Sequence, residues 1–328
     1  MKPELQRSCS DFISNREEVK KAFKAQFSEV YPVCSNIFLS RGKTADAETI
    51  TRCRGIIKEN AGILNNFRGT VYAPAACILA CSTDPEGKMA KASENYKMLK
   101  DYFKRSEYLA LTALLLADTV NESETRGAAE RGKAIYDLMN EKHRFLTGYE
   151  DSIFALTMAF SEKSIEQLTD EMELCMEELD GISSKNTLQT VAQILVMSDR
   201  PAKEKCARFK ELFEALRASG LKYGKYYELP VLASLAVTDK DISEIISDIS
   251  DVDGFLAKQK GYGGLFGLDK KSRLMHAAMI VSSLYSPCSP SSSKDIASLA
   301  SMISIVAMQI IMIIVISNSV AMSVSASH

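Results

Sequence analysis

The sequence is poor in the residues that break regular structure. Only 16 glycines and 8 prolines occur among 328 residues, whereas a sandwich or barrel of many strands needs a turn at about every 8 to 12 residues. An all-β fold is therefore excluded. Hydrophobic residues make up 46% of the chain and charged residues 25%, so the chain has enough apolar side chains to bury a core.

The chain also lacks a large excess of charge of either sign. Lys and Arg total 40, while Asp and Glu total 42, which gives a formal net charge of −2. Proteins dedicated to nucleic acids or to anionic membrane surfaces depend on a broad positive potential. We therefore expect no nucleic-acid partner.

Motifs for metals, nucleotides and secretion are missing too. No two of the eight cysteines have the C-x-x-C spacing of zinc and thioredoxin-like sites. The glycine-rich segment 260–273 fits neither G-x-G-x-x-G nor the Walker spacing, and we interpret it as a connection between helices. The first residues carry no apolar run of the kind found in signal peptides. We expect a cytoplasmic protein with reduced thiols, no metal and no cofactor.

What the sequence does contain is a repeated pair of segments between residues 30 and 286. A short, nearly uncharged segment is followed by a turn with an acid or a hydroxyl, by a longer amphipathic segment and by a basic turn. The short segments are 36–40, 73–82, 106–118, 151–161, 187–198, 229–238 and 273–283. Their last residues lie 36 to 45 residues apart, which indicates a period near forty.

The longer segments have one apolar face, and the short segments are apolar nearly all round. Met89, Ala92, Tyr96, Leu99 and Phe103 follow one another at steps of three and four, as in a helix that buries one side. A helix that is apolar on every side must be covered on every side. We therefore predict an all-α array of about six to seven αα-hairpins with the short helices inside. Both an open, solenoid-like array and a closed α/α toroid fit this pattern.

Four strings within this array are distinctive. They are RGIIKENAGILNNFRG (54–69), SEYLALTALLLAD (106–118), EKCARFKELFEALRASGLKYGKYYEL (204–229) and DVDGFLAKQKGYG (251–263). Together they resemble a bacterial family known only as domain of unknown function four thousand and three, and the resemblance covers most of the chain. It implies a helical protein without an assigned activity, so it supplies no catalytic residues.

The end of the sequence differs from the rest. We expect a helical-repeat domain at 1–286, a Ser- and Pro-rich linker at 287–295 and an apolar segment at 296–328 that contains no Asp, Glu, Lys or Arg. Its residues 299–316 are polar only at three positions, and about 20 apolar residues suffice to cross a bilayer. We predict a helix over 296–316 that docks on the array or self-associates. A membrane-associated protein with a C-terminal tail anchor is the alternative.

Three acidic residues stand at the starts of short helices in separate hairpins: Glu107, Asp151 and Glu228. In a closed toroid these starts would line a central cavity, where they are candidates for general acid, general base or metal ligand. Acids at helix starts are more commonly capping groups that interact with the helix dipole. For His276 a core position and for His143 a helix-end position are the favoured interpretations.

The turns that end the long helices are rich in Lys and Arg, while the opposite turns are rich in Asp and Glu. The array should therefore have a basic rim and an acidic rim, although favourable interactions with helix dipoles alone would produce both. Tyrosines lie among the basic residues late in the array, where they could support an anionic or peptide partner. The candidate binding residues are Lys222, Tyr223, Lys225, Tyr226, Lys258 and Lys260.

Two functions fit these features. The first is a non-enzymatic scaffold that presents an extended surface to a protein or peptide, because the sequence has repeats and lacks a catalytic signature. The second is an enzyme built on a closed α/α toroid, with the three acidic residues in its central cavity. Convergence of the carboxylates in one pocket would favour the enzyme.

Overall fold

The computed structural model describes residues 1–24, 30–60, 65–117, 122–262 and 268–285. Within these ranges the chain forms α-helices, a short 3-10 helix at Asn65–Phe67 and no β-strand, so the all-α prediction is confirmed. The helices are α1 (Pro3–Ala22), α2 (Val30–Ser40), α3 (Ala47–Asn60), α4 (Tyr72–Ala80), α5 (Pro85–Leu99), α6 (Glu107–Leu116), α7 (Glu122–Lys142), α8 (Asp151–Met158), α9 (Ile165–Glu178), α10 (Lys185–Leu195), α11 (Ala202–Ala218), α12 (Leu229–Ala236), α13 (Ile242–Leu256) and α14 (Lys270–Tyr285).

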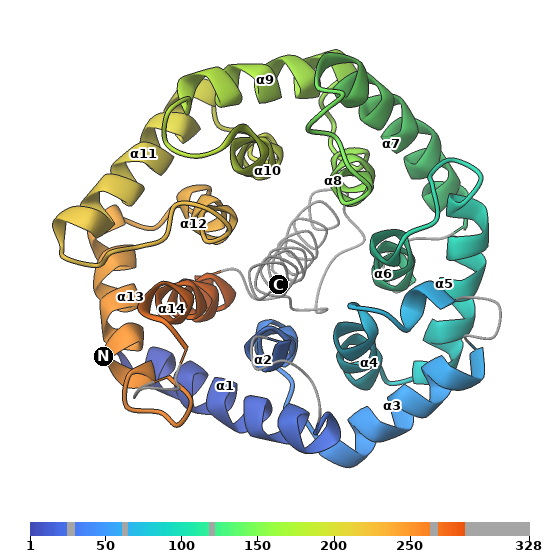
Figure 1. Ribbon diagram of the computed structural model, residues 1–328, viewed down its shortest axis with the longest axis horizontal. Helices are drawn as coiled ribbons and strands as arrows, with labels where there is room; N and C mark the ends of the chain where they lie inside the picture. Colours follow the sequence, from blue (N-terminus) through green and yellow to red (C-terminus); the bar gives the residue numbers. More distant parts are fainter. Residues whose placement is uncertain (25–29, 61–64, 118–121, 263–267, 286–328) are drawn as a thin grey trace, which may run out of the picture.

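The helices form two concentric rings (Figure 1). The odd-numbered helices make the outer ring, and the even-numbered helices make the inner ring, where they are seen end-on. Chain order follows the ring, because each outer helix is followed by the inner helix beside it. The ring is closed: α1 packs against α13 and α14, and α14 packs against α2.

Burial explains why the two classes of helix occupy different rings. All eight residues of α8 and all eight of α12 are buried, as the apolar character of these short helices requires. The outer helices bury one side only. In α9, for example, Leu168, Met172 and Cys175 are buried at helical spacing, while none of the charged residues of this helix is buried. The core therefore lies between the two rings.

The charges at helix ends follow the helix dipoles. Each of the seven outer helices has an acidic residue in its first turn. Five of them have a basic residue in the last turn. Such charges stabilise a helix by about 0.3–1 kcal/mol each. We call the end of the ring where outer helices finish and inner helices begin the basic end, and the opposite end the acidic end.

Several sequence predictions fall outside the described ranges. They concern the linker at 287–295, the apolar segment 296–328 with its helix at 296–316, and residues 263–267 of the glycine-rich segment. Among the helices of the described ranges, none combines the length and the apolar composition that crossing a bilayer requires.

Candidate functional site

The three acidic candidates lie at the basic end, each in a different place around the ring. Glu107 is the first residue of α6, Asp151 is the first residue of α8, and Glu228 directly precedes α12. Helices α6 and α8 are neighbours, whereas α12 lies across the ring from α6 (Figure 1). Each carboxylate binds its own set of partners, as described below. Within the described part of the chain, no group of three or more His, Cys, Asp and Glu residues could hold a metal ion.

Asp151 is the centre of a buried polar cluster between α8 and α10. Its Oδ2 accepts a hydrogen bond from the backbone N–H of Gly148 at 2.7 Å. Its Oδ1 accepts from the side-chain amides of Gln193 at 2.6 Å and Gln189 at 3.1 Å. Burial penalises the ionised carboxylate more than these hydrogen bonds favour it, so the pKa of Asp151 is raised to about 6. The Oε1 atoms of both glutamines are buried and have no hydrogen-bond partner.

Glu107 and Glu228 bind the backbone of the loops at the basic end. Glu107 Oε2 accepts from the N–H of Thr70, in the loop before α4, at 2.6 Å. Glu228 Oε2 accepts from the N–H of Tyr226 at 3.0 Å. The Glu228 carboxyl lies so close to Gly224 that a Cβ there would be 1.9 Å from the carboxyl carbon. These contacts hold the loops at the basic end in place, and the Glu228 side chain makes no capping hydrogen bond to α12.

The two histidines occupy structural positions. His276 is buried within α14, and its Nδ1 hydrogen-bonds with the hydroxyl of Tyr262 at 3.0 Å. Burial lowers the pKa of His276 to about 3, so its ring stays neutral. His143 directly follows α7, and its Nε2 lies 2.8 Å from the carboxylate of Glu173 on α9. The interpretation of His276 as a core residue is confirmed.

The predicted binding residues lie in the loops after α11 and α13. Five of them are exposed: Lys222, Lys225, Tyr226, Lys258 and Lys260. Tyr223 differs from the prediction, because only 5% of its surface is exposed. Its hydroxyl donates to the carbonyl of Glu228 at 3.0 Å, so Tyr223 supports the loop from within and offers no binding surface.

The loop after α13, which carries Lys258 and Lys260, is held against helix α1. The Arg16 guanidinium donates to the carbonyl of Lys260 at 2.9 Å and lies over the ring of Tyr262, 5.2 Å from its centroid. The loop after α13 is therefore fixed against α1. The exposed lysines of that loop lie at the same end of the ring as the last turn of α1, where Lys20 and Lys21 are located.

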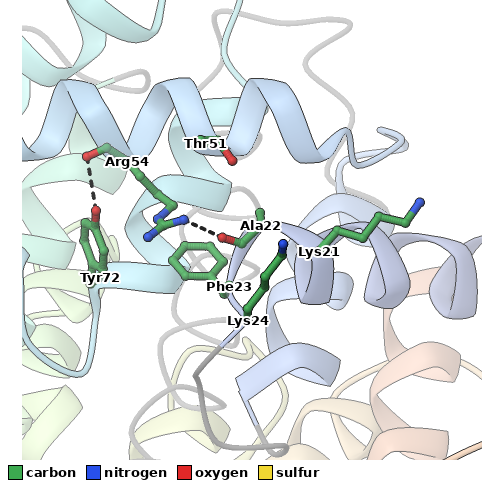
Figure 2. Close-up of a pocket in the computed structure, with 7 residues that line it drawn as sticks. All are labelled: Lys21, Ala22, Phe23, Lys24, Thr51, Arg54 and Tyr72. Atoms are coloured by element: carbon green, nitrogen blue, oxygen red, sulfur yellow. Dashed lines mark hydrogen bonds between the residues drawn. The ribbon is translucent and has the colours of Figure 1, made fainter.

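A cleft of about 540 Å³ opens where α1 ends and α3 and α4 pass beside it (Figure 2). It is lined by Lys21, Ala22, Phe23, Lys24, Thr51, Arg54 and Tyr72. Three of these seven side chains are cationic and two are aromatic. The cleft thus combines positive charge with flat apolar surfaces, which suits ligands with carboxylate or phosphate groups next to apolar ones.

Arg54 is the best-positioned cation of the cleft. One of its terminal nitrogens donates to the carbonyl of Ala22, the last residue of α1. Its guanidinium carbon lies 4.7 Å from the centroid of the Phe23 ring and 5.9 Å from that of Tyr72. The Nε atom of Arg54 is buried and has no hydrogen-bond partner. The Tyr72 hydroxyl donates to the carbonyl of Arg54 at 3.2 Å, and this hydrogen bond joins α4 to α3.

Besides Arg54, the cleft is lined by two lysines, Lys21 and Lys24. Lys21 forms an ion pair with Glu18 one turn earlier in α1, at 2.5 Å. Lys24 is exposed and directly follows Phe23. The hydrogen bond with Glu18 raises the pKa of Lys21, so this side chain keeps its charge at neutral pH.

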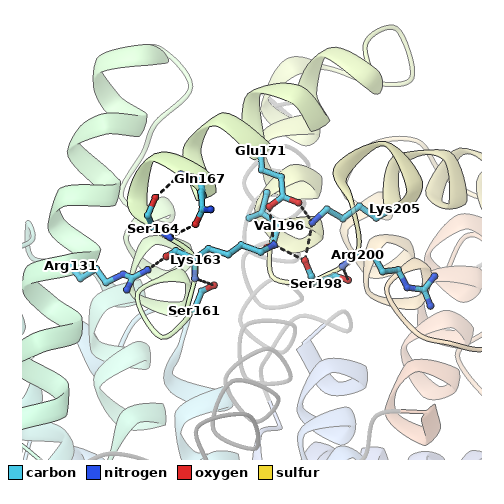
Figure 3. A network of polar contacts seen from close by, with 10 residues as sticks. All are labelled: Arg131, Ser161, Lys163, Ser164, Gln167, Glu171, Val196, Ser198, Arg200 and Lys205. Carbon is cyan, nitrogen blue, oxygen red and sulfur yellow. Dashed lines mark hydrogen bonds and ion pairs between the residues drawn. The ribbon is translucent and has the colours of Figure 1, made fainter.

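A second polar network lies at the acidic end and ties α9, α10 and α11 together (Figure 3). The ammonium groups of Lys163 and Lys205 both contact the carboxylate of Glu171. Both also donate to the carbonyl of Ser198, at 2.8 and 3.0 Å, just beyond the C-terminus of α10. Burial lowers the pKa of Lys205, and the hydrogen bond with Glu171 acts in the opposite direction. The cations complement the negative end of α10, so the network has a structural role.

The residues of the cleft could not be recognised from the sequence. Phe23 directly follows α1, Arg54 lies in α3 and Tyr72 starts α4, and their spacing in the sequence does not group them. The aromatic residue after α1 and the tyrosine that starts α4 meet because α1 and α4 both pack against α3. The signal in the sequence was limited to the basic turns, which place cations at this end.

Comparisons with known proteins find similarity to uncharacterised proteins. A family model described as a protein of unknown function, DUF4003, matches residues 15–319. The chain is similar to an uncharacterized protein of Bacillus subtilis, YeaA, with 24% identity over 259 residues, which is 76% of this chain and 78% of that protein. No solved structure matches the chain closely enough to count as a relative.

Proposed function

The chain belongs to the DUF4003 family, and from its geometry we propose that it is a non-enzymatic scaffold that binds an acidic peptide segment of a protein partner. The observation that carries the proposal is the cleft at the end of α1, where Arg54 and Lys24 lie beside two aromatic rings. Its volume of about 540 Å³ falls within the roughly 300–1,000 Å³ of typical ligand pockets.

The restricted position of the Arg54 side chain suits recognition of a carboxylate. Its contact with the carbonyl of Ala22 and its position over Phe23 restrict the side chain before any ligand arrives. A restricted side chain loses less conformational entropy on binding than a free one. Arginine also binds carboxylates through two parallel N–H groups, which fixes the orientation of the bound acid.

The surface beyond the cleft extends the same chemistry. Lys258 and Lys260 are exposed in the loop that Arg16 fixes to α1, and Lys225 is exposed in the preceding loop of the basic end. An extended acidic segment that leaves the cleft would meet these lysines next. The ring of exposed Tyr226 lies 6.0 Å from the Lys225 ammonium.

The experiment measures the binding of a fluorescent twelve-residue peptide of Glu, Leu and Ala to the full chain by fluorescence anisotropy. We expect Lys24→Glu to raise the Kd at least tenfold, because it reverses a charge beside Arg54. Lys203→Glu makes the same change at the acidic end, where Lys203 is exposed, and should change the Kd less than twofold. Binding should weaken as salt screens the charges. No binding to the wild type, or equal effects of both variants, would overturn the proposal.

One observation favours an enzyme as the second candidate. The pKa of Asp151 is raised to about 6, which lies near the pH at which a general acid or base works best. In this alternative Asp151 alone carries the proton transfer, because Glu107 and Glu228 lie at other places around the ring and bind their own loops. The test is to incubate the protein with a small-molecule extract and to follow its components by mass spectrometry. A conversion that the wild type performs and Asp151→Asn does not would replace the scaffold proposal.

A further inference from the structure

The large apolar side chains that the described part of the chain leaves exposed gather at the basic end. Besides Met1, they are Phe145, Tyr149 and Tyr226. Phe145 and Tyr149 lie in the loop between α7 and α8, and Tyr226 lies in the loop between α11 and α12. Phe145 is 99% exposed, so its ring projects from the fold with almost no packing contact. An aromatic ring in this position is available to a partner.

The loops of the basic end also carry an excess of positive charge. Within the described ranges, the loops that join an outer helix to the next inner helix have nine exposed Lys or Arg residues and three exposed Asp or Glu residues. The described loops of the acidic end have two exposed cationic and six exposed acidic residues. Helix dipoles do not require this difference, because every loop lies between the C-terminus of one helix and the N-terminus of the next.

Cations lie directly beside the exposed aromatic rings. The ammonium of Lys104 is 5.7 Å from the centroid of the Tyr149 ring, and that of Lys225 is 6.0 Å from the centroid of the Tyr226 ring. Exposed Arg144 immediately precedes Phe145. Aromatic rings and cations side by side are typical of surfaces that meet anionic lipids, because the rings enter the layer of head groups while the cations bind the phosphates.

We propose that the basic end docks on a membrane surface that contains anionic phospholipid, with the Phe145 ring inserted among the head groups. The distribution of the loops favours a flat partner. The loop before α8 and the loop before α12 lie on different sides of the ring (Figure 1). A planar surface across the end of the ring contacts both loops together, whereas one short peptide segment meets only neighbouring loops.

The net charge of −2 does not prevent this contact. The outer helices have 14 to 21 residues, which makes them about 21–32 Å long. Charges are screened over about 8–10 Å in physiological salt, so the acidic end is too far away to oppose docking of the basic end. The inference does not depend on the proposed peptide binding, because α7 and α8 lie across the ring from α1 and its cleft (Figure 1).

The first test uses the absence of tryptophan from the chain. Phe145→Trp places a single indole at the proposed contact, and Thr83→Trp places it at an exposed position of the acidic end as a control. Each full-length variant is mixed with vesicles of phosphatidylcholine alone, or of phosphatidylcholine and phosphatidylglycerol in about a two-to-one ratio. We expect the indole at position 145 to emit at shorter wavelength, and to be quenched by brominated lipid, when phosphatidylglycerol is present. The emission of the indole at position 83 should not change.

The second test measures the partition of the chain into the same vesicles by sedimentation. Arg144→Glu should lower the partition coefficient about fivefold or more, because a single basic side chain near an anionic surface changes the affinity by about that factor. Lys43→Glu makes the same kind of change at the acidic end, where Lys43 is exposed, and should leave the coefficient nearly unchanged. Both variants keep the buried core intact, since both positions are exposed.

Three results would each overturn the proposal. No partition of the wild type into the anionic vesicles would leave the exposed rings to a protein partner. Partition without a change in the emission of the indole at position 145 would assign the lipid contact to another part of the chain. Equal losses for Arg144→Glu and Lys43→Glu would mean that the basic end has no special role.

Discussion

Replacing Asp151 with Asn should remove a large pH-dependent contribution to the stability of the fold. The carboxyl is 97% buried, and its pKa is about 6 in the folded protein against an ordinary value of 3.8. The folded state therefore favours the protonated form. This contribution to stability is fully present below about pH 3.8 and is lost as the pH rises through about 6. At about 1.4 kcal/mol per pH unit between the two pKa values, the loss is about 3 kcal/mol.

The assay is urea unfolding of the wild type and of Asp151→Asn at several values between about pH 4 and pH 8. The informative quantity is the difference in unfolding free energy, because all other titrating groups cancel in it. Asn has one acceptor oxygen where the Asp151 carboxylate has two, so either the N–H of Gly148 or the two glutamine amides lose their acceptor, which costs about 1–3 kcal/mol at every pH. On top of this constant, the wild type should lose about 3 kcal/mol relative to the variant as the pH rises. Glu48→Gln, at an exposed position, is the control.

A difference that stays constant from pH 4 to pH 8 would refute this reasoning. It would mean that the amides of Gln189 and Gln193 compensate fully for the burial of the charge. A change in the opposite direction would mean that the cluster prefers the ionised carboxylate. Either result would also remove the observation that favours Asp151 as a general acid or base.

Three further substitutions test the packing at the two ends of the ring. Glu171→Gln removes the anion next to fully buried Lys205 and should lower the unfolding free energy by about 3–5 kcal/mol, measured by urea unfolding. Arg52→Ala breaks an ion pair in which both partners are exposed, so the urea midpoint should stay unchanged within error. Gly224→Ala would place a Cβ 1.9 Å from the Glu228 carboxyl carbon and should cost about 1–3 kcal/mol in the same assay. Full stability of Gly224→Ala would mean that this carboxyl can move aside freely.

The positions of the inner helices could be predicted because their signal is local. The short segments predicted at 151–161, 187–198 and 229–238 correspond to α8 at Asp151–Met158, α10 at Lys185–Leu195 and α12 at Leu229–Ala236. A run that is apolar all round can be recognised without knowing which elements cover it. The ends shift by two or three residues because the last hydrogen-bonded turn depends on contacts that the pattern does not contain.

The candidate site was predictable only in its charge. Basic turns place Lys222, Lys225, Lys258 and Lys260 at one end of the ring, and all four are exposed. The burial of Tyr223 could not be foreseen, because the side of a loop that a tyrosine takes is decided by the loop's own hydrogen bonds. The cleft could not be predicted from the sequence for a similar reason, because it depends on how three helices pack.

Closure of the ring could have been predicted from the sequence of the first and last inner helices. In an open array the first and last repeats need a polar outer face, because each has one side without a neighbour. Here the first and last inner helices lack such a face: ten of the eleven residues of α2 are buried, as are most residues in the centre of α14. Their partners are each other. Lys2 seals the same junction through ion pairs of 2.6 Å with Glu244 and 2.9 Å with Asp248. Two terminal inner helices with apolar central turns therefore predict a closed ring, because an open one would leave these turns exposed to water.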